Sequence, residues 1–63
     1  MEIELLMRIR RNNELLSSDW TQISDAPLTQ EQKLEWAAYR QVLRDLPTQA
    51  KFPNYVVWPT KPE

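Results

Sequence analysis

The chain contains no cysteine, no histidine and no glycine. Without cysteine and histidine it forms no disulfide and lacks the ligands that zinc and most transition metals prefer. Proton transfer by imidazole and attack by a thiolate or a Ser-His pair are excluded too. A phosphate-binding loop needs glycine where the backbone approaches the ligand. The composition therefore predicts a protein that is not an enzyme and uses no cofactor, metal or small-molecule substrate.

Charge and hydropathy argue against two further kinds of partner. Eight basic residues against nine acidic ones give a formal charge of −1, which provides no general attraction to nucleic acid or an anionic membrane. No apolar run approaches the ~20 residues that span a bilayer. The start, Met-Glu-Ile-Glu, is acidic where a secretory signal is basic. We expect a cytoplasmic protein without a nucleic-acid or membrane partner.

The chain is short, with 63 residues, which predicts one small domain over residues 1–63. A domain of this size buries only roughly 60% of the surface of its unfolded chain. Small scaffolds are usually reinforced by disulfides, a metal or association; the composition excludes the first and disfavours the second. Association is therefore expected, either with further copies of the chain or with another protein.

The first predicted helix covers residues from about 2 to 17. Leu5, Ile9 and Leu16 fall within about 40° of one another on a helix that advances ~100° per residue, and we expect this stripe to face the core. Asn12 lies inside the stripe. Its amide must either find a partner or mark the point at which the helix leaves its core.

A polar, turn-forming connection is predicted over residues from about 18 to 28. It is long for a helix-to-helix loop, so we expect it to be ordered, with Trp20 as its anchor. The second helix is predicted from about 29 to 46. Thr29 and Gln32 have the spacing of a capping box, in which each side chain binds the backbone amide of the other residue.

The second helix has a wider apolar stripe, and Pro47 ends the helical pattern. Residues from about 47 to 63 are predicted to form an extended, proline-rich arm that folds back over the helices or pairs with another protein. The predicted fold is all-α: a small two-helix hairpin with an ordered connecting loop and an extended C-terminal arm. The residues expected to face the core from the second helix are Trp36, Tyr39, Val42, Leu43 and Leu46.

Basic residues cluster on both predicted helices, beside an aromatic residue. Readers of single-stranded nucleic acid use such strips. Because the acidic counterweight is large, we favour a solvated helix flank in which Arg40 stacks on Trp36. The cluster consists of Arg8, Arg10 and Arg11 in the first helix and Lys33, Arg40 and Arg44 in the second.

Three tryptophans are many for so small an interior. Tryptophan serves equally as core filler and as an interface hot spot. We predict that Trp36 lies in the core and that Trp20 and Trp58 divide their surfaces between the fold and a partner. The candidate partner-binding residues are Trp20, Trp36, Tyr39, Arg40, Arg44, Tyr55, Trp58 and Pro59.

Six segments together resemble the phage tail assembly chaperone family and, more loosely, the C-terminal region of bacteriophage tail fibre assembly proteins. The resemblance covers residues 15–62. The segments are Leu15-Leu16-Ser17-Ser18-Asp19-Trp20-Thr21-Gln22, Asp25-Ala26-Pro27-Leu28-Thr29, Trp36-Ala37-Ala38-Tyr39-Arg40-Gln41, Leu43-Arg44-Asp45-Leu46-Pro47, Phe52-Pro53 and Val57-Trp58-Pro59-Thr60-Lys61-Pro62.

The resemblance implies a non-enzymatic protein that binds a tail, tail fibre or tape-measure polypeptide during virion assembly, in the cytoplasm of an infected bacterium. It implies no cofactor. One alternative is a minor structural protein that stays in the tail, baseplate or fibre of the virion. A second alternative is a small regulatory module that binds nucleic acid through the basic cluster.

Overall fold

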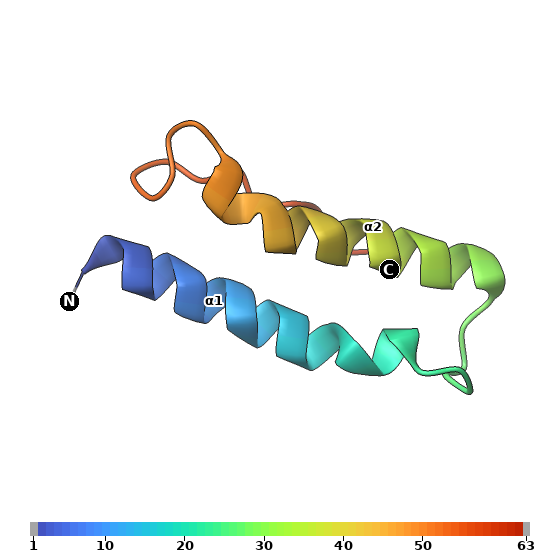
Figure 1. The fold of residues 1–63 in the computed structure, drawn as a ribbon. Helices are drawn as coiled ribbons and strands as arrows, with labels where there is room; N and C mark the ends of the chain where they lie inside the picture. Colours follow the sequence, from blue (N-terminus) through green and yellow to red (C-terminus); the bar gives the residue numbers. More distant parts are fainter. Residues whose placement is uncertain (1, 63) are drawn as a thin grey trace.

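The computed structural model describes residues 2–62 and consists of two antiparallel helices with a C-terminal arm (Figure 1). Helix α1 spans Ile3–Ser18 and helix α2 spans Gln30–Asp45. Each is followed by a short 3-10 helix, η1 at Asp19–Gln22 and η2 at Leu46–Thr48. The all-α helical hairpin predicted from the sequence is confirmed. Neither helix is long and apolar enough to cross a membrane within the part of the chain that the structure describes.

Helix α2 begins at the predicted capping box. The Thr29 hydroxyl accepts from the Gln32 amide at 3.1 Å, and the Gln32 side chain accepts from the Thr29 amide at 2.8 Å. Helix α2 ends at Asp45 and the chain continues as η2, because Pro47 has no N–H with which to extend the α-helical hydrogen bonding. Local signals therefore set both ends of this helix.

The core is small and is supplied mainly by α2. Trp36, Tyr39, Leu43 and Leu46 are its buried hydrophobic residues. The edge of the Trp36 ring faces the ring of Tyr39, with centroids 5.7 Å apart and planes at 87°. Val42 was expected in this set, but it is 43% exposed because it lies at the edge of the buried arc. Half-buried hydrophobic residues pack around this cluster from the other segments: Leu15, Leu28, Val56 and Trp58.

The expected orientation of α1 is wrong. Leu5, Ile9 and Leu16 are 49%, 43% and 70% exposed and lie on the side of α1 that faces away from α2. The side toward α2 is mostly polar and ends at the fully buried Ser18. The physical reason is that α1 meets α2 through polar contacts: Arg40 of α2 donates to the Leu15 carbonyl oxygen and the Ser18 hydroxyl, and Tyr39 donates to the Glu14 carboxylate. The covered residues of α1 are Glu4, Met7, Arg8, Arg11, Glu14, Leu15 and Ser18.

The connection between the helices is ordered by a hydroxyl group as much as by Trp20. Thr21 is completely buried and donates to the Ser18 carbonyl oxygen at 2.6 Å. Trp20 packs on Trp36 with ring centroids 6.2 Å apart but remains 46% exposed. The loop is therefore held from inside by Thr21 and covered from outside by Trp20.

The C-terminal segment begins with turns, and its backbone becomes extended only later. Hydrogen-bonded turns continue from η2 as far as Tyr55, so the extended stretch starts near Val56 and not at Pro47. The Gln49 side chain stabilises this turn, because its amide nitrogen donates to the Val57 carbonyl oxygen and its oxygen accepts from the Val57 amide, both at 2.9 Å. From there the arm returns along α2 (Figure 1).

Candidate functional site

The outward side of α1 is an apolar surface that no other segment of residues 2–62 covers. We call Leu5, Leu6, Ile9 and Leu16 the α1 apolar face; each is at least 43% exposed. Together they present on the order of 400 Å² of apolar area, which is within the range of the largest patches on monomeric proteins and is often functional there. Asn12 interrupts the row and is exposed. Its amide oxygen accepts from Arg11 at 3.0 and 3.2 Å, so the polar residue in the stripe has found a surface partner.

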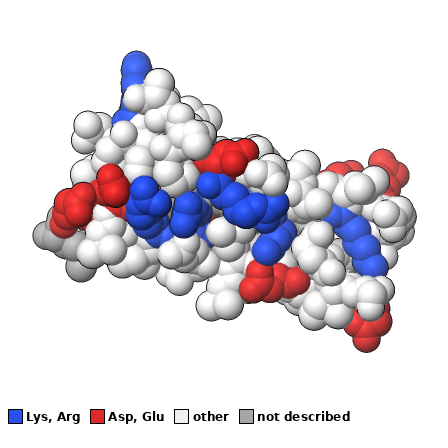
Figure 2. Space-filling view, in the orientation of Figure 1, with Lys and Arg blue, Asp and Glu red and all other residues white. Residues whose placement is uncertain are grey.

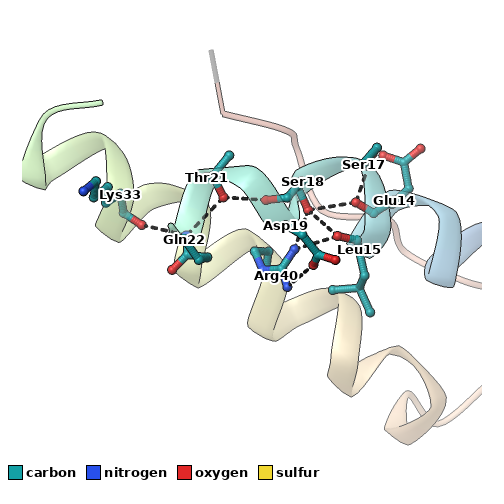
Figure 3. A network of polar contacts seen from close by, with 9 residues as sticks. All are labelled: Glu14, Leu15, Ser17, Ser18, Asp19, Thr21, Gln22, Lys33 and Arg40. Carbon is teal, nitrogen blue, oxygen red and sulfur yellow. Dashed lines mark hydrogen bonds and ion pairs between the residues drawn. The ribbon is translucent and has the colours of Figure 1, made fainter. Parts of the chain in front are cut away.

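The inward, polar side of α1 is fixed to α2 by Arg40 (Figure 3). One guanidinium nitrogen, Nη1, donates to the Leu15 carbonyl oxygen at 2.7 Å and to the Ser18 hydroxyl at 2.8 Å. The other, Nη2, forms an ion pair with Asp19 at 2.7 Å. The predicted stacking of Arg40 on Trp36 is not among the cation–π contacts of residues 2–62, because these three acceptors take the guanidinium.

The polar network continues toward the loop end of the hairpin. The Gln22 amide nitrogen donates to the Thr21 hydroxyl at 3.1 Å and to the Lys33 carbonyl oxygen at 3.4 Å (Figure 3). The Lys33 ammonium donates to the Ser24 carbonyl oxygen at 3.0 Å. No buried side-chain nitrogen or oxygen in the described chain lacks a hydrogen-bond partner. The buried polar groups of this interface are therefore satisfied by the fold itself.

Tyr39 joins the same two helices at the other side of the core. Its hydroxyl donates to the Glu14 carboxylate at 3.0 Å. Burial raises the pKa of Tyr39, and the hydrogen bond to Glu14 and the charge of that carboxylate raise it further, while the positive charge of Arg10 opposes the rise. The phenol is thus held protonated as a structural donor.

The arm is held against α1 by cation–π contacts. The Arg10 guanidinium carbon lies 4.0 Å from the centroid of the Trp58 ring, and that of Arg8 lies 5.5 Å from the centroid of Phe52. Beyond Trp58 the arm borders an open groove of about 910 Å³ against α2, lined in part by Tyr39, Val42 and Pro59. Within residues 2–62 no three acidic side chains gather closely enough to hold a metal ion.

The candidate residues from the sequence fall into two groups. Trp36 and Tyr39 are buried, as the core prediction for Trp36 required, and Arg40 is mostly covered. The second group is accessible to a partner. Trp20, Arg44 and Tyr55 are exposed, and Trp58 and Pro59 are half-buried.

Sequence reasoning missed the α1 apolar face as a surface, although one signal pointed to it. A core stripe rarely includes an asparagine, because a buried amide needs a partner. Asn12 between Ile9 and Leu16 was therefore evidence that the stripe faces away from the core.

Residues 5–63 match the model of one protein family, described as phage tail assembly chaperone protein. The match starts ahead of the motifs that carry the resemblance and includes residues 5–18 of α1. No curated protein and no solved structure matches the chain.

Proposed function

The chain belongs to the phage tail assembly chaperone family, and from this premise we propose that it binds a tail polypeptide before assembly and shields its apolar surface. The proposed client is a tail, tail fibre or tape-measure polypeptide in the cytoplasm of the infected bacterium. The role is non-catalytic. The observation that carries the proposal is the exposed α1 apolar face, since a patch of this size often marks a binding surface.

The spacing along this face fits a helical client. Leu5, Ile9, Asn12 and Leu16 follow one another at intervals of four, three and four residues, the interval pattern of a coiled-coil seam. A client helix laid along α1 would cover these side chains, and a single polar residue such as Asn12 would favour one register over others. Binding of this kind removes the client's own apolar stripe from water while it waits for assembly.

The turn of the arm offers a second, smaller contact. Tyr55 and Val57 are 62% and 59% exposed and line a shallow hollow of about 360 Å³. Trp20 exposes 46% of its surface at the opposite end of the hairpin. We include these aromatic residues in the proposed binding surface, with α1 as its centre.

The test is co-expression with each polypeptide of the phage tail, measuring how much of it stays soluble and co-purifies. We expect the double variant Leu5→Ser/Ile9→Ser to lose a client that the unchanged chain keeps soluble. The control is Ile23→Ser/Leu34→Ser, which removes at least as much exposed apolar surface elsewhere, since these residues are 53% and 61% exposed against 49% and 43% for Leu5 and Ile9. Equal recovery of the client with both double variants would refute the proposal.

A further inference from the structure

One face of the hairpin carries a row of basic side chains across its middle (Figure 2). The contact between Arg40 and the Leu15 carbonyl oxygen sets the register of the antiparallel helices. One helical turn from it on both helices, toward the start of α1 and the end of α2, Arg11 and Arg44 lie opposite each other. We call the row the cationic seam; its members are Arg8, Arg11, Lys33, Arg40 and Arg44.

The seam carries more positive charge than the chain itself neutralises. Arg8 pairs with Glu4 at 3.3 Å and Arg40 pairs with Asp19 at 2.7 Å. Within residues 2–62 the other three members form no ion pair. They donate only to uncharged oxygens. Arg11 donates to the side-chain oxygen of Asn12, Arg44 to the side-chain oxygen of Gln41, and Lys33 to the backbone carbonyl oxygen of Ser24.

Arg11 and Arg44 are therefore two positive charges on facing turns of the hairpin, and neither has an ion pair within residues 2–62. A negatively charged ligand bound along this row is attracted by both charges. Arginine is suited to this because its planar guanidinium binds a carboxylate through two parallel hydrogen bonds. The two ion pairs already present show that carboxylates fit along this row.

We propose that the cationic seam binds an acidic segment of the client polypeptide, a conclusion that rests on the proposed function and names the client's chemistry. The segment is extended and about six residues long, because the seam covers about fourteen helical residues, or roughly 20 Å, and a strand advances ~3.3 Å per residue. Around α1, the seam residue Arg8 lies between Arg11 and Leu5, so the seam borders the α1 apolar face. A client with carboxylates next to an apolar stretch can therefore occupy both surfaces together.

Nucleic acid is the competing ligand for a row of arginines, and two observations favour carboxylates. The net charge of −1 gives no long-range attraction to a polyanion. The seam also adjoins Leu5 and Ile9, which are 49% and 43% exposed and offer nothing to phosphates.

The first measurement is an NMR titration of the full chain with hexaglutamate, and with a thymidine hexanucleotide as competitor. We expect hexaglutamate to shift seam resonances at 50 mM salt and the shifts to shrink strongly at 500 mM, because salt screens the charges. The variant Arg11→Glu/Arg44→Glu should bind at least ~10-fold more weakly. The control Lys51→Glu/Lys61→Glu changes the net charge equally, away from the seam, and should bind as the unchanged chain does. Tighter binding of the hexanucleotide, absence of shifts, or equal loss in both variants would overturn the proposal.

The second measurement repeats the client co-expression with the single variants Arg44→Glu and, as its control of equal charge change, Lys61→Glu, because Lys51 lines the hollow with Tyr55 and Val57. Loss of soluble client with Arg44→Glu but not with Lys61→Glu supports the seam. If both variants keep the client soluble and Leu5→Ser/Ile9→Ser does not, the proposed function stands and the seam proposal falls. If even the unchanged chain keeps no tail polypeptide soluble, the proposed function fails. Hexaglutamate binding that is weakened by Arg11→Glu/Arg44→Glu alone would then still show that the seam binds carboxylates.

Discussion

Truncating Arg40 to alanine removes the three hydrogen bonds that tie the end of α1 to α2. Each bond from a charged donor contributes roughly 1.5–3 kcal/mol. The bond to Asp19 counts for less, about 0–1 kcal/mol, because that carboxylate is 57% exposed to solvent. The Ser18 hydroxyl keeps its bond to the Glu14 carbonyl oxygen, which reduces the loss further. We expect Arg40→Ala to lower the free energy of unfolding by about 2–3 kcal/mol.

That loss is large for so small a chain. At about 0.05–0.15 kcal/mol per residue, 63 residues give a total of roughly 3–9 kcal/mol. Urea unfolding followed by tryptophan fluorescence measures the change; with a slope of about 1 kcal/mol per molar urea, the midpoint should fall by about 2–3 M. Trimethylamine N-oxide, added at one concentration to all samples, stabilises the folded state, so that the variant is still folded at low urea and its baseline can be measured.

Two controls separate the buried bonds from the exposed ion pair. Arg44→Ala removes an exposed arginine of the same helix and should change the free energy of unfolding by less than about 0.5 kcal/mol. Asp19→Asn tests the exposed pair alone and should cost less than about 1 kcal/mol. If Arg40→Ala destabilises the chain no more than Arg44→Ala does, the polar network does not hold the helices together and the reasoning is refuted.

Three further predictions concern the core, the helix cap and pH. Leu43→Ala should cost about 3 kcal/mol in urea unfolding because Leu43 is fully buried, whereas Val42→Ala, at 43% exposure, should cost under about 1 kcal/mol; similar costs would contradict the assigned core. Thr29→Ala should lower the free energy of unfolding by about 1 kcal/mol, whereas Thr60→Ala, at a threonine that caps no helix, should leave it almost unchanged. Equal values for the two variants would contradict the capping box. Burial raises the pKa of Tyr39, so unfolding favours loss of its proton and stability should fall as the pH rises above about 10; Tyr39→Phe should lack this part of the fall, and identical profiles at pH 8–11 would contradict it.

Helix α2 could be predicted from the sequence because its signals are local. The capping box at Thr29 and Gln32 fixes its start, Pro47 prevents its continuation, and four of the five residues expected in its core stripe are buried. The family, too, could be recognised from motifs that lie mostly in the loop, α2 and the arm. In each case the information lies within a few residues of the feature it determines.

The orientation of α1 could not be read in the same way, because it depends on what the helix packs against. The usual rule places the apolar stripe inward, on the assumption that the helix has only the core to meet. Here Ser18 and Thr21 occupy the buried positions, and their hydroxyls are acceptable there only because Arg40 and nearby backbone carbonyl groups provide partners. Asn12 in the stripe indicated an outward face, but the periodicity of α1 alone does not reveal the partners that allow Ser18 and Thr21 to be buried.

Two sets of apolar residues have separate tasks in this fold. Trp36, Tyr39, Leu43 and Leu46 form the buried core, and Trp58 of the arm packs against this cluster. The aliphatic residues of the α1 apolar face are not part of that cluster. A client can therefore bind to and leave this face without breaking any contact of the core. A chaperone that releases its client at assembly and remains folded afterwards requires this separation. Client binding then replaces only contacts between the α1 apolar face and water, and no part of the free energy of folding is spent on it.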